Sequence, residues 1–211
     1  MRAAYIAEGV TNVARLNHSL NRPDPQDVSD LELLTTTASG GSAAFRTLYD
    51  RYERRVYNYV RGFLKQSSSA EEVVIETMTA VWHGAGGFTG SSKVSTWVFG
   101  IARHKALDAV RKLKSRPDAV SLDQTEELVD AGEDPLASTE ASHNAQLMLR
   151  AIAQLSDDHR EILRLAFYED LPYGDIASLL SIPDNTVKTR VFYAKQQLKR
   201  HLETLGVGGG E

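Results

Sequence analysis

Two helical patterns separated by a short break occupy residues 173–201, and this segment constrains the fold more than any other. The first pattern places Ile176, Ala177 and Leu180 on one face, and the break falls at Ser181–Pro183. A second helix is expected from Asp184 or Asn185, because its apolar residues recur at the spacing of a helix with one buried face. These residues are Val187, Val191, Ala194, Leu198, Leu202 and Leu205. The two patterns predict a helix-turn-helix.

The other face of the second helix is basic. Residues 185–202 hold no Asp or Glu but carry five cations, Lys188, Arg190, Lys195, Lys199 and Arg200. Such a face gains energy beside an anionic partner, which favours duplex DNA. The alternative is an amphipathic surface helix whose charges are simply solvated.

A helix-turn-helix places the first turns of its second helix in the major groove. We therefore expect contacts to base edges or flanking phosphates from Thr186, Lys188, Thr189 and Arg190. Contacts to the DNA backbone are expected further along the helix, from Tyr193, Lys195 and Gln196.

A second segment, residues 95–112, interleaves aromatic and basic residues. Its apolar residues recur at helical intervals and are followed by Arg103, Lys105, Arg111 and Lys112. Single-stranded nucleic acid suits this combination, because bases stack on aromatic faces while cations follow the phosphates. On the pattern alone, Trp97 and Phe99 are more simply explained as core aromatics.

The net charge of −4 hides a segregated distribution. Residues 103–116 carry six Lys or Arg against Asp108, a balance of +5, whereas residues 117–142 carry eight Asp or Glu and no Lys or Arg, a balance of −8. The acidic segment is expected to be extended or mobile. Its acidity can be explained without any specific function, as that of a solvated tether between two domains.

Length and composition exclude several classes of protein. A chain of 211 residues has room for two small domains. Cysteine is absent, which excludes disulfides and thiolate metal sites and fits a reducing cytoplasm. We find no membrane span, signal core, nucleophile-base arrangement or metal-ligand spacing. We expect a soluble, cytoplasmic protein with no membrane insertion, catalytic residue, metal, cofactor or small-molecule substrate.

Five motifs occur in one order along the chain. They are Ala43–Tyr49 with Arg51-Tyr52, then Ala70–Val74 ending in Val81-Trp82, then Phe88 with Ser95–Arg103, then Leu155–Arg160, and finally the helix-turn-helix. Because these motifs occur in this order from about Asp30 to Leu205, the chain resembles a bacterial RNA polymerase sigma factor of the extracytoplasmic-function (ECF) group.

The resemblance implies an all-α fold of two small helical domains joined by a flexible acidic linker. We expect an N-terminal tail at 1–29, a region 2 domain at 30–116, the linker at 117–140, a region 4 domain at 141–205 and a C-terminal tail at 206–211. Such a factor binds core RNA polymerase, recognises −35 and −10 promoter elements, helps to melt DNA and is commonly held by an anti-sigma factor. The competing hypothesis is a conventional helix-turn-helix regulator that leaves DNA closed.

The resemblance also assigns site residues. Contacts to the −35 element are assigned to the helix-turn-helix residues above. Contacts to the −10 element are assigned to Lys93, Ser95, Thr96, Trp97, Arg103, His104, Lys105, Arg111 and Lys112. Contacts to core polymerase are assigned to Glu71, Glu72 and Glu76. The chain departs from the family pattern at Glu72, Ile75, His104 and Asn185, where Asp, Gln, Asn and Gly are usual.

Apolar spacing predicts the cores of the two domains. In the first, we expect a helix over 43–64 that buries Phe45, Leu48, Tyr49, Tyr52, Val56, Tyr59, Val60 and Phe63. A helix over 69–83 should bury Val73, Val74, Thr77, Met78 and Val81. In the second, the core is expected from Ala145, Met148, Ile152, Leu155, Ile162, Leu163, Ala166 and Phe167. Ser156 is a predicted N-cap, with Arg160 and Arg164 on the outer face of its helix.

Overall fold

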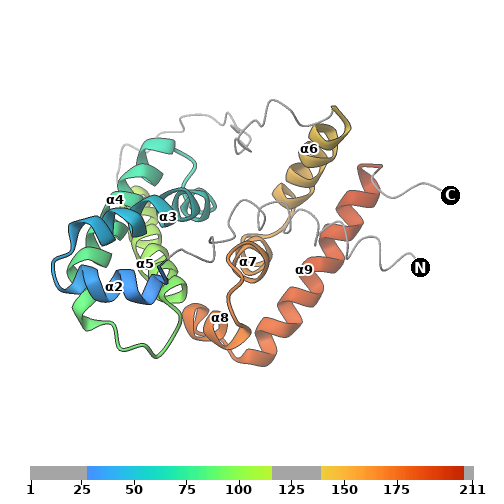
Figure 1. The fold of residues 1–211 in the computed structure, drawn as a ribbon. Helices are drawn as coiled ribbons and strands as arrows, with labels where there is room; N and C mark the ends of the chain where they lie inside the picture. The colour runs from blue at the N-terminus through green and yellow to red at the C-terminus, as the bar shows by residue number, and fades with distance from the viewer. Residues whose placement is uncertain (1–27, 116–138, 207–211) are drawn as a thin grey trace. The chain divides into compact units, whose positions relative to one another are not determined.

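The structure is a computed structural model that describes residues 28–115 and 139–206, with side chains of the second range described from Ala145 onward. All regular secondary structure in these two ranges is helical (Figure 1). The described residues fall into two compact units, 28–115 and 139–206. The all-α prediction is thus confirmed. The acidic linker and nearly all of both predicted tails lie outside the described residues.

The first unit contains four α-helices and one short 3₁₀ turn. They are α2 (Asp30–Ala38), α3 (Ser42–Val60), α4 (Ser67–Gly84), η1 (Ala85–Gly87) and α5 (Val94–Lys114). The four helices pack against one another, as Figure 1 shows in blue to green. Phe99 of α5 is fully buried, with its ring centroid 5.3 Å from that of Tyr59 and 6.5 Å from that of Tyr52. For Phe99, the interpretation as a core aromatic is confirmed.

The predicted core of the first unit is correct along α4 and partly wrong along α3. All five predicted residues of α4 are buried, as are Leu48, Tyr52, Val56, Tyr59 and Val60 of α3. Phe45, Tyr49 and Phe63 are only half-buried. Phe45 and Tyr49 lie at the surface beside α4, where the Phe45 ring packs edge-on against Trp82 at 5.0 Å. The helix also ends at Val60 rather than Leu64, and Arg61 caps the following turn by donating to the Leu64 carbonyl at 3.1 Å.

Helix α2 is fixed at its first turn. Ser29 is its N-cap and forms a capping box with Glu32, whose carboxylate accepts from the Ser29 backbone N–H at 2.9 Å. The hydrogen bond from the Ser29 hydroxyl, together with the one from its backbone N–H, lowers the pKa of Glu32 below its ordinary 4.5. Asp30 accepts hydrogen bonds from Tyr52 and Arg51 of α3, which ties the start of α2 to the core.

The second unit contains α6 (Thr139–Ala153), α7 (Asp157–Leu163), the π-helical turn η2 (Arg164–Tyr168), α8 (Tyr173–Leu180) and α9 (Asp184–Thr204). Helices α6, α7 and α8 all contact the long helix α9, drawn in red in Figure 1. The predicted N-cap is confirmed, since the Ser156 side chain accepts from the His159 backbone N–H at 3.4 Å.

Two parts of the predicted core of this unit are wrong. On α6, Ala145 is exposed and Met148 and Ile152 are half-buried, while Ala151 is fully buried. After Leu163, Ala166 and Phe167 are half-buried and Leu165 is buried instead. The π turn explains this difference after Leu163, because its wider spacing rotates the side chains away from the α-helical register.

None of the helices in the two described ranges is both long enough and apolar enough to cross a membrane.

Candidate nucleic-acid interface

The turn between α8 and α9 depends on one unusual residue. Ser181 follows α8 with φ 56°, in the left-handed region, and the Ile182 backbone N–H donates to the Ala177 carbonyl at 3.0 Å. This ends α8 as a left-handed C-cap. Pro183 then provides an extended N-cap and α9 begins at Asp184. The predicted helix-turn-helix, with its break at Ser181–Pro183, is confirmed.

The predicted −35 residues on α9 divide into two groups. Five are exposed: Lys188, Thr189, Tyr193, Lys195 and Gln196. Thr186 and Arg190 are half-buried. Arg190 forms an ion pair with Asp158 of α7, with 3.0 Å between Nη1 and Oδ2. Arg190 is therefore held against α7 instead of extending into solvent with the exposed group.

Two further cations predicted on an outer face are not fully exposed. Arg160 is half-buried, and it donates to the Leu155 carbonyl at 3.0 Å and to Asp157 at 3.1 Å. Arg164 is also half-buried, with its guanidinium carbon 6.0 Å from the centre of the Tyr168 ring. The two arginines are therefore less exposed than predicted, because these long side chains fold back onto their own helix and its ends.

Sequence reasoning missed one exposed aromatic. Phe192 is 56% exposed next to Tyr193, with 5.5 Å between the two ring centroids. Its signal is a large apolar residue directly after the core residue Val191, where the helical spacing puts it outside the buried stripe. The exposed face of α9 thus combines cations with two aromatic rings.

In the first unit, the predicted −10 residues begin at the N-terminus of α5. Lys93 is the exposed N-cap, Ser95 is half-buried and Thr96 is buried. Trp97 is half-buried, and its ring lies 5.4 Å from Phe88. A Cβ placed on Gly84 would lie 3.1 Å from the indole, so glycine leaves room for the ring there.

Two of the cations along α5, Lys105 and Arg111, pair with carboxylates. Lys105 Nζ lies 3.2 Å from Glu76 Oε2 of α4. Asp108 binds both His104, at 3.3 Å, and Arg111. The remaining predicted residues of α5 are Arg103, which is half-buried, and Lys112, which is exposed.

The three predicted polymerase contacts on α4 do not share one environment. Glu71 and Glu72 are exposed, whereas Glu76 is half-buried and turned toward Lys105. Ile75 is 60% exposed on the same helix. This part of α4 therefore presents two carboxylates and one large apolar side chain to solvent.

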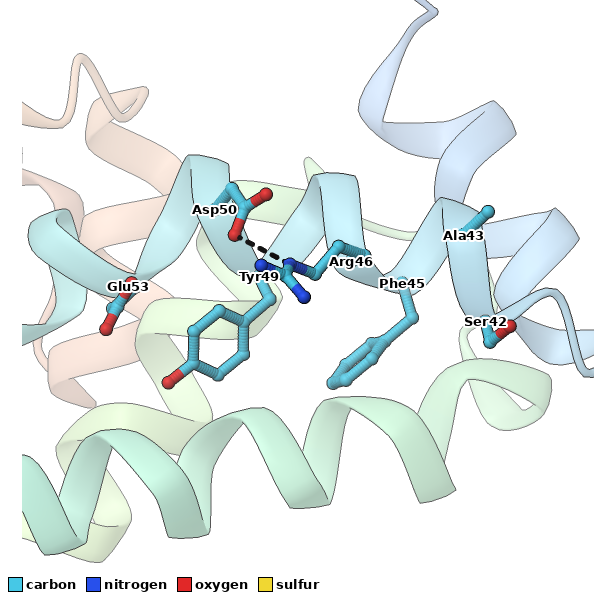
Figure 2. Close-up of a pocket in the computed structure, with 7 residues that line it drawn as sticks. All are labelled: Ser42, Ala43, Phe45, Arg46, Tyr49, Asp50 and Glu53. Atoms are coloured by element: carbon cyan, nitrogen blue, oxygen red, sulfur yellow. Dashed lines mark hydrogen bonds and ion pairs between the residues drawn. The ribbon is translucent and has the colours of Figure 1, made fainter.

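A surface hollow of about 620 Å³ lies along α3 and holds none of the predicted site residues. Phe45 and Tyr49 line it with Arg46, Asp50 and Glu53, and Arg46 pairs with Asp50 at 3.3 Å (Figure 2). Burial, together with the nearby charge of Glu53, raises the pKa of Tyr49. Within the described ranges, no cluster of three His, Asp or Glu residues is arranged to hold a metal ion.

Two family descriptions match the chain. Sigma-70 region 2 matches residues 48–116, and Sigma-70 region 4 matches residues 145–198. The chain is 32% identical to the ECF RNA polymerase sigma factor RpoE of Cereibacter sphaeroides over 169 residues, which is 76% of this chain and 87% of the relative. It is 29% identical to the ECF RNA polymerase sigma factor SigL of Mycobacterium tuberculosis over 171 residues, 81% of this chain and 95% of the relative.

Solved structures share the fold. CnrH in complex with the cytosolic domain of CnrY matches with a TM-score of 0.58 at 22% identity, over 83% of this chain and 97% of that chain. The sigma factor RpoE in complex with the anti-sigma factor NepR from Bartonella quintana also gives 0.58 at 22% identity, over 75% of this chain and 96% of that chain. With both Sigma-70 regions in order and close relatives along most of its length, the chain belongs to the sigma-70 family of RNA polymerase sigma factors, in the ECF group.

Proposed function

We propose that this alternative sigma factor directs promoter-specific initiation with a division of labour between its two units. Residues 28–115 bind core polymerase and the −10 element, and residues 139–206 bind the −35 element. The observation that carries this proposal is the helix-turn-helix, because its second helix presents Lys188, Thr189, Tyr193, Lys195 and Gln196 to solvent. These are the side chains that a docked recognition helix places against base edges and phosphates.

The proposed −10 site is the N-terminal half of α5 with the loop before it. Trp97 and Phe88 offer neighbouring aromatic faces beside a glycine-rich segment, residues 84–90. An unstacked base gains stacking energy on such faces, and this offsets part of the cost of opening the duplex. The cations at 103–112 follow the adjoining phosphates. Thr96 is buried, so it supports the site through its backbone and its packing.

The proposed polymerase contact is the exposed part of α4. Glu71 and Glu72 supply charge, and Ile75, 60% exposed, supplies an apolar contact at a position where the family usually has Gln. A large exposed apolar side chain beside carboxylates on one helix is typical of a surface that is covered in a complex.

We further propose that the chain acts in the cytoplasm, performs no covalent chemistry and is sequestered by an anti-sigma partner. A solved relative in fold, RpoE, is bound to the anti-sigma factor NepR, and this supports a partner of the same class here. The absence of cysteine means that such a partner, and not this chain, would supply any thiol sensing.

The direct test is transcription in vitro with purified bacterial core polymerase, the full chain and a library of genomic promoter fragments. We expect factor-dependent start sites that share two spaced elements. The proposal fails if no such start sites arise while the same core polymerase is active with a known factor. Trapping by an anti-sigma partner is checked separately, by comparing co-purified proteins from resting and stressed cells.

A further inference from the structure

The ion pair between Glu76 and Lys105 joins two surfaces to which the proposed function gives different partners. Glu76 lies on α4, the proposed polymerase-binding helix, and Lys105 lies on α5, the proposed −10 helix. Their charged atoms are 3.2 Å apart, and the side chains are 39% and 34% exposed. Helix α5 packs along α4, so the contact is part of the packed interface between the two helices.

The pair offsets the charge that Lys105 would bring to DNA. A lysine contributes to DNA affinity by neutralising a phosphate and releasing a counterion. While Glu76 holds Lys105, that lysine adds little to the binding, and the carboxylate itself repels an approaching phosphate. A half-exposed ion pair is also weak enough to open when a stronger partner competes for one of its members.

Glu76 differs from its neighbours on α4. Glu71 and Glu72 are exposed, whereas Glu76 is half-buried and paired with Lys105 of α5. A polymerase surface that docks on α4 and attracts its carboxylates would therefore act on the α5 cation through Glu76. The other two carboxylates would bind without changing α5.

We propose that Glu76 is a positioning residue that keeps Lys105 from DNA until α4 docks on core polymerase. Docking draws the carboxylate toward the polymerase and releases Lys105 to a phosphate near the −10 element. Because such coupling is reciprocal, DNA held by Lys105 also strengthens polymerase binding. This proposal rests on the proposed function of the two helices.

The first arm of the test uses the free, full-length chain. Its affinity for a fluorescein-labelled, mixed-sequence single strand of about 20 nucleotides is measured over a salt series. Glu76→Gln should bind more tightly, with a salt slope steeper by about 0.7, the contribution of one released cation on a single strand. Lys105→Gln should have little effect alone and should abolish the gain in the double variant.

The charge control is Glu53→Gln, which changes the net charge equally but lies on the exposed face of α3. An equal gain from Glu53→Gln and Glu76→Gln would overturn the proposal, because the effect would then be one of net charge. A large loss from Lys105→Gln in the free chain would also overturn it, because Lys105 would then already be available to DNA.

The second arm uses holoenzyme at saturating factor on a promoter that the wild-type chain transcribes. Here Lys105→Gln should weaken open-complex formation and make its salt slope shallower by about 0.7 to 0.9. Equal effects of Lys105→Gln in the free chain and in holoenzyme overturn the coupling. Absence of any factor-dependent transcript from the wild-type chain is a separate result, and it overturns the proposed function instead.

Discussion

At the scale of single residues, the cations of the two candidate DNA surfaces are not equivalent. Lys188 extends from α9 into solvent, whereas Arg190, two positions later, is bound to Asp158. Helical spacing explains the difference, because residues two apart point about 200° from one another around the helix axis and so face different neighbours. On α5, Trp97 is half-buried, with its ring centroid 5.4 Å from that of Phe88.

For α9, we predict that Lys188→Ala weakens binding to −35 duplex DNA and lowers the salt slope by about 0.9, whereas Arg190→Ala changes the slope by clearly less. Arg190→Ala should instead lower the free energy of unfolding by up to about 1 kcal/mol, the usual limit for a partly exposed ion pair. Asp158→Ala is the matched control, and the double variant should lose no more stability than either single one. Urea unfolding and salt-dependent binding measure the two effects. Equal slopes for the two α9 variants would contradict this assignment.

For α5, we predict that Trp97→Ala reduces open-complex formation by about 5- to 150-fold, the loss of one base-stacking contact worth roughly 1–3 kcal/mol. Trp97→Phe should retain part of the activity, because a smaller aromatic face remains. Permanganate reactivity of melted thymines measures opening, and polymerase binding by the same variants serves as the control. Normal melting by Trp97→Ala would remove Trp97 from the site.

At the scale of elements, helix ends carry much of the specificity of this fold. Ser29 and Glu32 begin α2 with a reciprocal capping box, and Ser156 caps α7. Ser181 ends α8 in the left-handed conformation and so sets the direction in which α9 begins. The π turn after α7 shifts the register of the following side chains. Each of these depends on one or two residues and not on the apolar pattern of the helix.

The cap of α2 gives a pH-dependent prediction. Ser29→Ala should lower the free energy of unfolding by about 1 kcal/mol near neutral pH. The pKa of Glu32 is lowered in the folded state, so its share of the cap is complete above the ordinary pKa of 4.5 and is lost as the pH falls through the folded value. The difference between wild type and Ser29→Ala should therefore shrink in acid, as urea unfolding at several pH values would measure. A difference that does not shrink at all as the pH falls below 4.5 would contradict the capping box.

The turn of the helix-turn-helix gives another prediction. Ser181→Gly should stabilise the second unit by about 0.5–1 kcal/mol, because glycine adopts the positive φ without a steric cost. Ser178→Gly, in the preceding helix, should destabilise the unit by a similar amount and is the matched control. Thermal unfolding of the two variants should move the transition in opposite directions. Lower stability in both would show that the Ser181 side chain has a role of its own.

At the scale of the whole molecule, the proposed function predicts a monomer that reads two different elements. A conventional regulator of the competing kind would dimerise on a palindrome with half-sites one helical turn apart. Sedimentation of the full chain, alone and with promoter DNA, should therefore give one chain per DNA. A stable dimer that protects two identical half-sites would contradict the prediction. Family membership already places the chain among initiation factors.

The sequence by itself determined the helical class and the helix-turn-helix. Apolar residues at steps of three and four marked the buried face of α9, and five of the six predicted positions are buried. The capping box of α2 was also readable from Ser29, Glu32 and the leucines that follow, although the prediction covered only the start of the first domain near Asp30 and no helix there. Both kinds of signal are local, because they depend on residues within one or two helical turns.

Only the tertiary structure decided which polar side chains are available to partners. Glu76 with Lys105, and Asp158 with Arg190, are far apart in sequence and meet because their helices pack together. A pattern along one helix gives the direction of a side chain but not its neighbour on the next helix. The sequence pattern likewise did not show that Thr96 is buried or that a π turn moves Leu165 into the core.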